Sequence, residues 1–323
     1  MRLRLIPEDT KINFFGLSKI TFGGSILLLV LSIVAFLAFG LNYGIDFKGG
    51  TTIRTESTQS VDVGAYRAAL DPLGLGDVAI TEVFDPGFGP DRNVAEVRIQ
   101  AQGDAESIAP EIITAMQDAL TAVDSNVQFA SVESVGPKVS GELIKSAIFS
   151  VVGAIGAIVI YIWLRFEWQF AVGAIVALVH DVGLTIGLFA LLQIKFDLAI
   201  IAALLTIVGY SINDTVVVFD RVRENLRKYK VMPLIEVLNL SANETLSRTM
   251  MTSGTTLMAL IALLVLGGDV IRGFVFAITW GILVGTYSSI YIAKNIVLML
   301  GVKRDWSKKD PRTVGRYADV EGK

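Results

Sequence analysis

The first long apolar run of the chain, at residues 18–41, reads SKITFGGSILLLVLSIVAFLAFGL. No charged side chain occurs between Lys19 and Asp46. The run is long enough to cross the hydrocarbon core of a bilayer, which requires about 20 apolar residues. It is also longer than the core of a signal peptide, and no small-x-small cleavage site precedes Asn42. We therefore expect residues 18–41 to form a retained membrane-spanning helix.

Further apolar runs of spanning length follow at residues 142–164, 169–192, 197–219, 250–267 and 273–299. The whole chain is 53% hydrophobic and only 18% charged, which is more apolar than a water-exposed surface accommodates. The sequence therefore predicts an α-helical integral membrane protein with six transmembrane helices. A net charge of −3 argues against nucleic acid as a partner. The absence of cysteine excludes disulfides, thiolate chemistry and cysteine-bound metals.

Most of the lysine and arginine residues that flank these runs belong to four regions. They lie at the amino terminus, at Arg165, in the segment 220–248 and in the carboxyl-terminal tail. The positive-inside rule then places all of these regions in the cytoplasm and the long segment 44–140 outside. We accordingly divide the chain into an N-terminus with the first span (1–43), an external domain (44–140), spans two to six with a cytoplasmic loop at 220–248 (141–301), and a cytoplasmic tail (302–323).

The external segment has the patterning of a small α/β domain. Strands are expected at 51–56, 78–84, 93–100 and 127–135, and helices at 61–70 and 105–123. This βαββαβ order is that of a ferredoxin-like fold. In the second helix Ile108, Ile112, Ala115, Ala119 and Val123 are predicted to form the apolar face, with Asp104 as the N-cap. A domain of roughly ninety residues can sustain its own core without disulfides.

Two local patterns concern the helices of the membrane region. The segment 220–248 is expected to be partly helical and to lie along the membrane surface, with Pro233 in the first turn of a short helix. Small residues spaced four apart, Gly153 with Ala157 and Gly281 with Gly285, predict close contacts between helices.

Ionisable side chains stand out at two places inside the predicted spans, where a charge costs about 2.5 to 3.5 kcal/mol by insertion scales. Asp214 lies about 9 Å from the cytoplasmic end of the fourth span, which is too deep for a helix cap. His180 and Asp181 are adjacent in the third span, and His180 is the only histidine of the chain. Because an uncharged residue would be favoured at such depths, we interpret Asp214 as an ion-carrying group, with His180 or Asp181 extending its path.

Structural interpretations of the same residues stay open. Asp214 could serve only as the partner of Arg248, which lies at the cytoplasmic start of the fifth span. His180 and Asp181 could simply hydrogen-bond neighbouring helices. The ion-carrying role is favoured by polar side chains on spans four and five: Ser211, Asn213, Thr215, Thr252, Ser253, Thr255 and Thr256. The charged residues at 220–224 are interpreted as a solvated surface cluster rather than a binding site.

The segment Asp46-Phe47-Lys48-Gly49-Gly50-Thr51 follows the first span directly. Its paired glycines predict a sharp redirection of the chain into the first strand. A strand-like stretch follows them, whereas a phosphate loop requires a helix there. No Walker, zincin, nucleophile-elbow or kinase motif occurs in the sequence. We therefore expect no enzyme activity, no metal site and no cofactor.

Three segments together resemble the SecF subunits of the SecD/SecF family of bacterial protein-export proteins. They are GIDFKGGT at 44–51, GYSINDTVVVFDR at 209–221 and GTYSS at 285–289. The resemblance is supported by Val135-Gly136-Pro137, His180-Asp181, Arg248-Thr249 and Thr252-Ser253. It extends from the first span to the sixth. A SecD chain would be expected to carry a larger external region.

The resemblance implies a multi-pass protein of the bacterial inner membrane with residues 44–140 in the periplasm. It implies a SecD-like partner, with which the chain forms a transporter-like unit similar to the RND superfamily of proton-driven exporters. Such complexes are thought to use the proton motive force to draw unfolded polypeptides out of the SecYEG channel, with YajC as a further candidate partner. In the family's pattern Asp214 and Arg248 match the proton pathway. Structural motifs of the family match Asp46, Gly49, Gly50, Gly136 and Pro137.

Two other functions stay open. The chain could be half of an RND-type small-molecule exporter, or a structural assembly factor of the translocon in which Asp214 only packs. The residues also leave the transported ion open, because a lone carboxylate among hydroxyl groups can serve a proton or a sodium ion.

Overall fold

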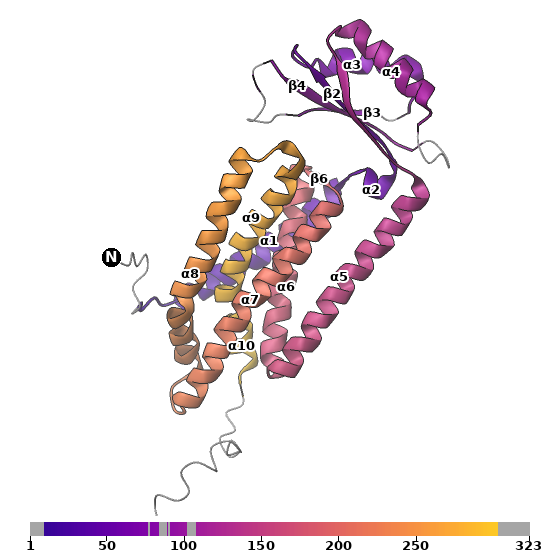
Figure 1. The fold of residues 1–323 in the computed structure, drawn as a ribbon. Coiled ribbons are helices and arrows are strands. Elements are labelled where there is room, and N and C mark those ends of the chain that lie inside the picture. Colours follow the sequence, from indigo (N-terminus) through magenta and orange to yellow (C-terminus); the bar gives the residue numbers. More distant parts are fainter. Residues whose placement is uncertain (1–9, 77, 84–88, 90, 102–107, 303–323) are drawn as a thin grey trace, which may run out of the picture.

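The structure is a computed structural model and describes residues 10–76, 78–83, 89, 91–101 and 108–302. Figure 1 shows a bundle of long helices with a small α/β domain at one end. Within the described residues six helices are long and apolar enough to cross a membrane, which confirms the prediction. They are α1 (Ser18–Phe39), α5 (Pro137–Arg165), α6 (Trp168–Leu192), α7 (Leu198–Lys228), α8 (Leu234–Leu266) and a last run formed by α9 (Asp269–Ser288), the π-helical turn Ser289–Ala293 and α10 (Lys294–Leu300).

The prediction of a separate surface helix within residues 220–248 is wrong. Helix α7 continues to Lys228, and α8 begins at Leu234 after a short turn. Pro233 is the N-cap of α8, which runs without a break into the fifth span. The polar composition of this segment is equally compatible with helix ends that extend past an apolar stretch, so composition alone could not distinguish the two arrangements.

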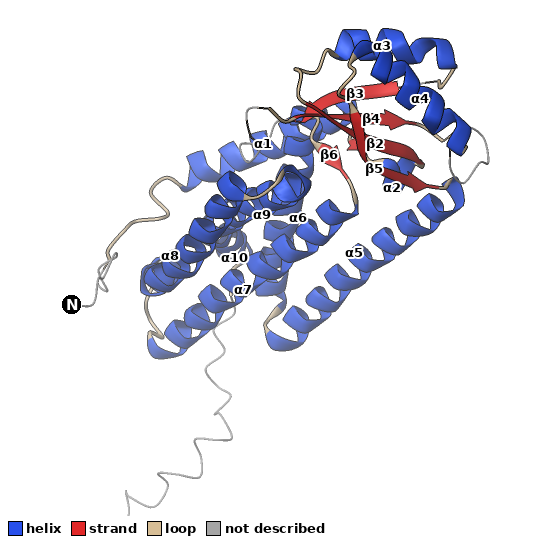
Figure 2. Ribbon diagram, turned by 45° about the horizontal axis from the view of Figure 1, so that its top comes forward, coloured by secondary structure: helices blue, strands red, loops and turns tan. Residues whose placement is uncertain are grey.

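The α/β domain has the predicted element order: β2 (Gly50–Ser57), α3 (Val63–Leu70), β3 (Val78–Val83), β4 (Asn93–Ile99), α4 (Pro110–Val123) and β5 (Gln128–Val135). The strands form one sheet in the order β3-β4-β2-β5, and all neighbouring pairs are antiparallel. Each helix connects two strands that are separated by one other strand, as in the ferredoxin-like fold. Figure 2 shows α3 and α4 together on one face of the sheet.

The domain core lies between the sheet and these two helices. Met116 and Leu120 are the fully buried residues of α4. The predicted apolar face of this helix, which included Ala115 and Ala119, is therefore rotated by one residue, since both alanines are only partly buried. Asp104, the predicted N-cap, lies outside the described residues, and the described part of α4 has Ala109 as its N-cap.

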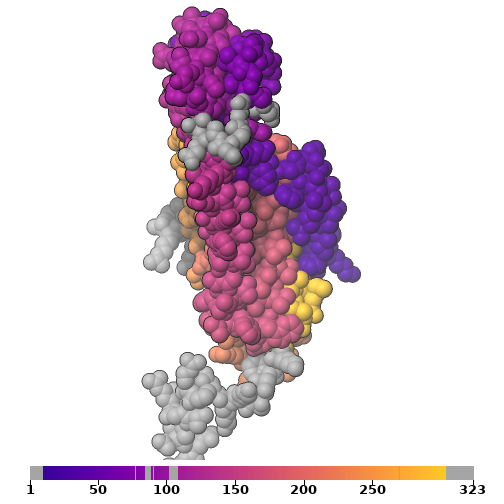
Figure 3. Space-filling view, turned by 90° about the vertical axis from the view of Figure 1, so that its right-hand side faces the viewer, coloured from indigo at the N-terminus to yellow at the C-terminus, as the bar shows by residue number. Residues whose placement is uncertain are grey.

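Helices α6 and α7 lie at the centre of the bundle, and α5 lies at its edge. Half of the apolar window of α6 is buried, compared with 11% for α5. Figure 3 shows α5 running along the outside of the bundle below the α/β domain. A Cβ at Gly281 of α9 would overlap the side chain of Ile207 of α7, whereas nothing lies within 4 Å of a Cβ at Gly153. The predicted close helix contact is therefore present at Gly281, whereas none is found at Gly153 among the described residues.

A short connection joins the domain to the bundle. After α1 the chain forms β1 (Asn42–Tyr43) and the single-turn helix α2 (Ile45–Lys48) before it enters β2. Strand β1 pairs in parallel with β6 (Lys195–Phe196), the short strand between α6 and α7. The first and fourth spans are thus connected at the end of the bundle that carries the domain (Figure 2).

Candidate functional site

Asp214 is buried near the middle of α7. Its Oδ1 accepts a hydrogen bond of 2.6 Å from Thr249 Oγ1 of α8, and its Oδ2 accepts one from Ser289 Oγ of the sixth span. Each carboxylate oxygen therefore has a hydroxyl donor from a different neighbouring helix. A hydroxyl group can donate to a carboxylate or accept from a carboxylic acid, so these contacts accommodate both protonation states.

A second carboxylate, that of Asp181 on α6, is fully buried in the same bundle. Its Oδ2 accepts hydrogen bonds from Ser211 Oγ of α7 at 2.6 Å and from Ser288 Oγ of α9 at 2.8 Å. Its Oδ1 lies 2.9 Å from Nδ1 of His180. The adjacent histidine and aspartate of the third span therefore contact each other and two further helices.

Two consecutive serines connect the carboxylates, since Ser288 binds Asp181 and Ser289 binds Asp214. These serines lie where α9 passes into the π-helical turn Ser289–Ala293. Such turns are rare and frequently occur at functional sites. The result is one polar cluster between α6, α7, α8 and the sixth span. We call it the carboxylate cluster, and it consists of His180, Asp181, Ser211, Asp214, Thr249, Ser288 and Ser289. No group of side chains suited to a metal ion is found in the described ranges.

Three predicted neighbours of Asp214 do not contact it. Arg248 is exposed and forms no ion pair with Asp214 in the part of the chain that the structure describes, although its charge acts on Asp214 through space. The next residue, Thr249, makes the direct contact. Asn213 is also exposed, because one residue along a helix turns the side chain by about 100°. Thr252 donates to carbonyl oxygens of its own helix.

Ser211 and Thr215 lie on the buried face of α7, as expected for site residues, but neither contacts Asp214. Ser211 binds Asp181, and Thr215 Oγ1 has no hydrogen-bond partner among the described residues. The sequence prediction omits Thr249, Ser288 and Ser289, which make the direct contacts. The available signal was a pair of adjacent hydroxyl residues, Ser288 and Ser289, inside the mostly apolar sixth run.

A column of rings extends from the carboxylate cluster to the segment before α1. His180 stacks on Tyr287 with ring centroids 6.2 Å apart, and Tyr287 stacks on Tyr291 at 5.0 Å. Tyr291 meets Phe14 edge to face at 6.0 Å. The Tyr287 hydroxyl also donates to the carbonyl oxygen of Thr21 in α1 at 2.8 Å. The cluster is therefore packed against the first span through aromatic contacts.

Lys294 is fully buried beside this column. It was not among the predicted site residues, although it lies inside the predicted run 273–299. Its Nζ lies 4.7 Å from the ring centroid of Phe14 and 5.4 Å from that of Phe15. No hydrogen-bond partner of Nζ is found within the described ranges, where the faces of these two rings are its contacts. The side-chain amide of Asn243 binds both the N–H and the C=O of Ile12, at 2.8 and 2.9 Å, and holds this segment against α8.

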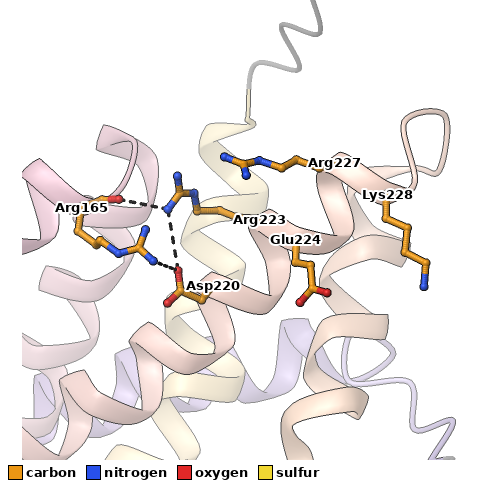
Figure 4. A pocket seen from close by; sticks show the side chains of 6 residues that line it. All are labelled: Arg165, Asp220, Arg223, Glu224, Arg227 and Lys228. Carbon is orange, nitrogen blue, oxygen red and sulfur yellow. Dashed lines mark hydrogen bonds and ion pairs between the residues drawn. The ribbon is translucent and has the colours of Figure 1, made fainter. Parts of the chain in front are cut away.

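A separate set of charged side chains, which does not include Asp214, lines a hollow near the end of α7 (Figure 4). Arg165 donates to Asp220 Oδ1 at 2.7 Å, and Arg223 lies 3.9 Å from the same oxygen. The side chains of Arg165 and Asp220 are 42% and 44% exposed. Exposed ion pairs contribute little to stability, so this geometry agrees with the predicted solvated surface cluster.

Two family models match the chain. The model described as "Protein export membrane protein SecD/SecF, C-terminal" matches residues 115–303, which include the whole carboxylate cluster. The model of the SecD/SecF GG motif matches residues 34–61, which include Asp46, Gly49 and Gly50.

Similar proteins along nearly the full length are named protein translocase subunit SecF. The relative from Cereibacter sphaeroides is 65% identical over 99% of both chains. The relative from Rhodobacter capsulatus is 61% identical over 96% of this chain and 95% of its own.

Two solved structures have a similar fold. The crystal structure of SecDF, a translocon-associated membrane protein from Thermus thermophilus, matches 93% of this chain with a TM-score of 0.82 and 38% identity. SecDF in a super-membrane-facing form matches 90% with a TM-score of 0.66 and 39% identity. The chain spans only 40% and 39% of those two SecDF chains. Its match to the family model over residues 115–303 and its full-length SecF relatives show that the chain belongs to the SecD/SecF family of protein-export membrane proteins.

Proposed function

We propose that this chain is the SecF-like component of a bacterial export complex and couples the proton motive force to a late stage of polypeptide translocation. The proposed role is transport rather than catalysis, and the names of its relatives as translocase subunits support it. The proposed main partner is a SecD-like half, because the chain corresponds to 40% of the solved SecDF chain. The SecYEG channel, the emerging unfolded polypeptide and YajC are the further proposed partners.

The observation that carries the proposal is the carboxylate cluster. A charge buried among spanning helices is costly, so a group kept there is expected to be used. Protonation of Asp214 would remove its charge and change what Thr249 and Ser289 donate or accept. Since the two hydroxyl groups belong to different helices, the relative positions of α7, α8 and α9 can depend on the protonation state.

The available driving force is large enough for such a switch. One charge that crosses 100 mV gains about 2.3 kcal/mol, which shifts a two-state equilibrium about fiftyfold. We propose the proton as the transported ion, with Asp214 as its carrier, Asp181 and His180 as an extension of the path, and Arg248 acting on Asp214 through space. Sodium is the alternative ion.

The proposed location is the bacterial inner membrane, with both termini in the cytoplasm and the α/β domain in the periplasm. The distribution of basic residues supports this orientation, since they cluster around the turn between α7 and α8. The domain lies at the other end of the bundle (Figure 1).

The proposal predicts that Asp214→Asn assembles normally and abolishes ion-dependent stimulation of export. Asparagine keeps the size and hydrogen-bonding capacity of the side chain but cannot titrate. The measurement is export of a secreted protein, together with ion flux, in vesicles that contain the whole complex. Flux under a pH gradient without sodium, and under a sodium gradient at equal pH, identifies the ion.

Asp220→Asn is the matched control, because Asp220 is an exposed acid on the same helix. It should leave export and flux at wild-type levels. If Asp214→Asn supports both at wild-type levels with normal assembly, Asp214 only packs, and the chain is a structural assembly factor. Flux coupled to a small molecule in place of the polypeptide would instead favour the exporter half.

A further inference from the structure

The start of α7 is attached to the chain that enters the α/β domain. Strand β6 leads directly into α7 and pairs with β1, which precedes the domain. The backbone N–H of Gly44 donates to the carbonyl oxygen of Phe196 at 2.8 Å and extends this pairing by one residue. The helix that carries Asp214 therefore begins at the connection between bundle and domain.

Asp46, in α2, binds α7 directly. Its Oδ2 accepts a hydrogen bond of 3.0 Å from the backbone N–H of Leu198, the first residue of α7. The N–H groups of a first helical turn have no acceptor within the helix, and the positive end of the helix dipole favours a carboxylate there. Asp197 caps the same helix end by accepting from the N–H of Ile200 at 3.2 Å. Asp46 thus adds a second carboxylate, which comes from the connection to the domain.

The backbone around Asp46 is held closely by the domain. Gly49 and Gly50 have positive φ angles of 69° and 125°, and a Cβ on Gly50 would overlap the carbonyl oxygen of Ile99 in β4. Ser140 Oγ, in the first turn of α5, donates to the carbonyl oxygen of Asp46 at 2.9 Å. The segment after Asp46 is therefore packed against the sheet and turns sharply into β2.

Side chains of β4 strengthen the same junction. Arg98 donates to Asn42 Oδ1 and to the carbonyl oxygen of Tyr43, each at 3.2 Å. Lys195 of β6 donates to Glu96 Oε1 at 3.0 Å. Because β4 is a central strand of the sheet, these contacts connect the middle of the domain to the strand pair beside α7.

Helix α7 connects this junction to the carboxylate cluster. It is continuous from Leu198 to Lys228. Asp214 lies about 24 Å beyond Leu198 along the axis at the rise of an α-helix. An axial shift or rotation of α7 that begins at Asp214 therefore also moves the backbone N–H of Leu198, and this group is bound to Asp46.

We propose that Asp46 is a positioning residue that transmits displacement of α7 to the α/β domain through its hydrogen bond to the N–H of Leu198. The inference rests on the proposed function, because the displacement is attributed to ion binding at Asp214. Asp46 itself holds no transported ion. Its loss should therefore separate ion flow from export, whereas loss of the Asp214 carboxylate should stop both.

The test uses the full chain in the reconstituted complex, with export and ion flux measured on the same vesicles. Asp46→Ala is expected to keep ion flux and to lower export per transported ion by about tenfold, the factor that corresponds to one hydrogen bond to a charged group. Asp46→Asn retains an oxygen acceptor and should recover part of the coupling. Asp197→Ala is the matched control, since it removes a cap from the same helix end without touching the hydrogen bond to Asp46.

A distance measurement tests the connection itself. The chain has no cysteine, so spin labels can be attached at Asp118→Cys on α4 and Ala202→Cys on α7. The label distance should change with pH in the otherwise unaltered chain and should lose that change in Asp46→Ala. An unaltered response in Asp46→Ala, or a parallel fall of flux and export, would overturn the proposal. Export per ion could also fall equally in Asp197→Ala and Asp46→Ala. Asp46 would then act only as a helix cap, and the proposal would be overturned as well.

Discussion

At the scale of single residues, Ser289 is the donor that connects Asp214 to the sixth span. Ser289→Ala leaves Oδ2 of Asp214 without this donor, which disfavours the ionised carboxylate. A hydrogen bond to a charged group contributes about 1.5 kcal/mol or more, equivalent to about one pH unit. We therefore expect the pH of half-maximal ion-dependent export to rise by about one unit in this variant. A series of vesicle assays at stepped pH measures the midpoint.

Ser288→Ala is the control for this variant. The Ser288 hydroxyl lies one residue away but donates to Asp181, so its removal should leave the Asp214 midpoint unchanged. Equal shifts in both variants would mean that the shift does not come from the donor to Asp214. The expected effect of Ser289 on Asp214 would then be wrong.

The identity of the buried acids could be predicted from the sequence, but their contacts could not. Asp214 and Asp181 stand out because a charge within an apolar run is costly wherever the helix packs. Which hydroxyl groups donate to them depends on how each helix is rotated about its axis. The sequence of an apolar span gives little indication of this rotation, because most faces of the helix are equally apolar. Arg248 and Thr249 illustrate this limit, since adjacent positions face outward and inward, respectively.

At the scale of helices, Gly281 sets how closely α9 approaches α7. A methyl group at this position would overlap Ile207, so Gly281→Ala is expected to destabilise the bundle by about 1 to 3 kcal/mol through overpacking. The measurement is the thermal unfolding midpoint of the protein in detergent. Gly153→Ala is the control, because the added methyl group meets no atom within 4 Å and should leave the midpoint unchanged or slightly raised. Equal losses in both variants would contradict the close contact.

Element types were predictable wherever the hydrophobic period is strong. The ferredoxin-like order follows from alternation in the strands and turn residues between them, and the structure has the same six elements. The burial of Met116 and Leu120 in place of Ala115 and Ala119 was not predictable, because a shift by one residue keeps the same helical period. The sequence also could not show that α8 is continuous from Leu234, since polar residues suit both a loop and a helix end.

At the scale of the whole molecule, different features of the sequence determine the helical bundle and its junction with the α/β domain. The number of spans follows from apolar length alone, and the structure confirms it. The junction between bundle and domain depends on contacts between residues far apart in the chain, such as Asp46 with Leu198 and Arg98 with Tyr43. Local patterns carry no information about such pairs. The paired glycines marked the position of the junction but not its partner helix.

The orientation of the molecule in the membrane is the remaining whole-molecule prediction. Basic residues near the turn between α7 and α8 favour the cytoplasm for that end. The domain lies at the opposite end of the bundle (Figure 1), so it should face the periplasm. Because the chain contains no cysteine, one cysteine can be placed at Asp118 on the exposed face of α4 and another, in a separate variant, at Val231, which is 98% exposed in the turn.

A membrane-impermeant maleimide added to spheroplasts should label Asp118→Cys and leave Val231→Cys unlabelled. Both variants should react after the membrane is permeabilised, which controls for accessible thiols. The expectation has a physical basis, since moving the arginines and lysines at the end of α7 across the bilayer would work against the membrane potential, at about 2.3 kcal/mol per charge for 100 mV. The long α/β segment carries no such restriction and can be translocated whatever its charge. Labelling of Val231→Cys from outside intact spheroplasts would reverse the orientation. The α/β domain would then lie in the cytoplasm, where it could not reach a polypeptide that emerges on the periplasmic side.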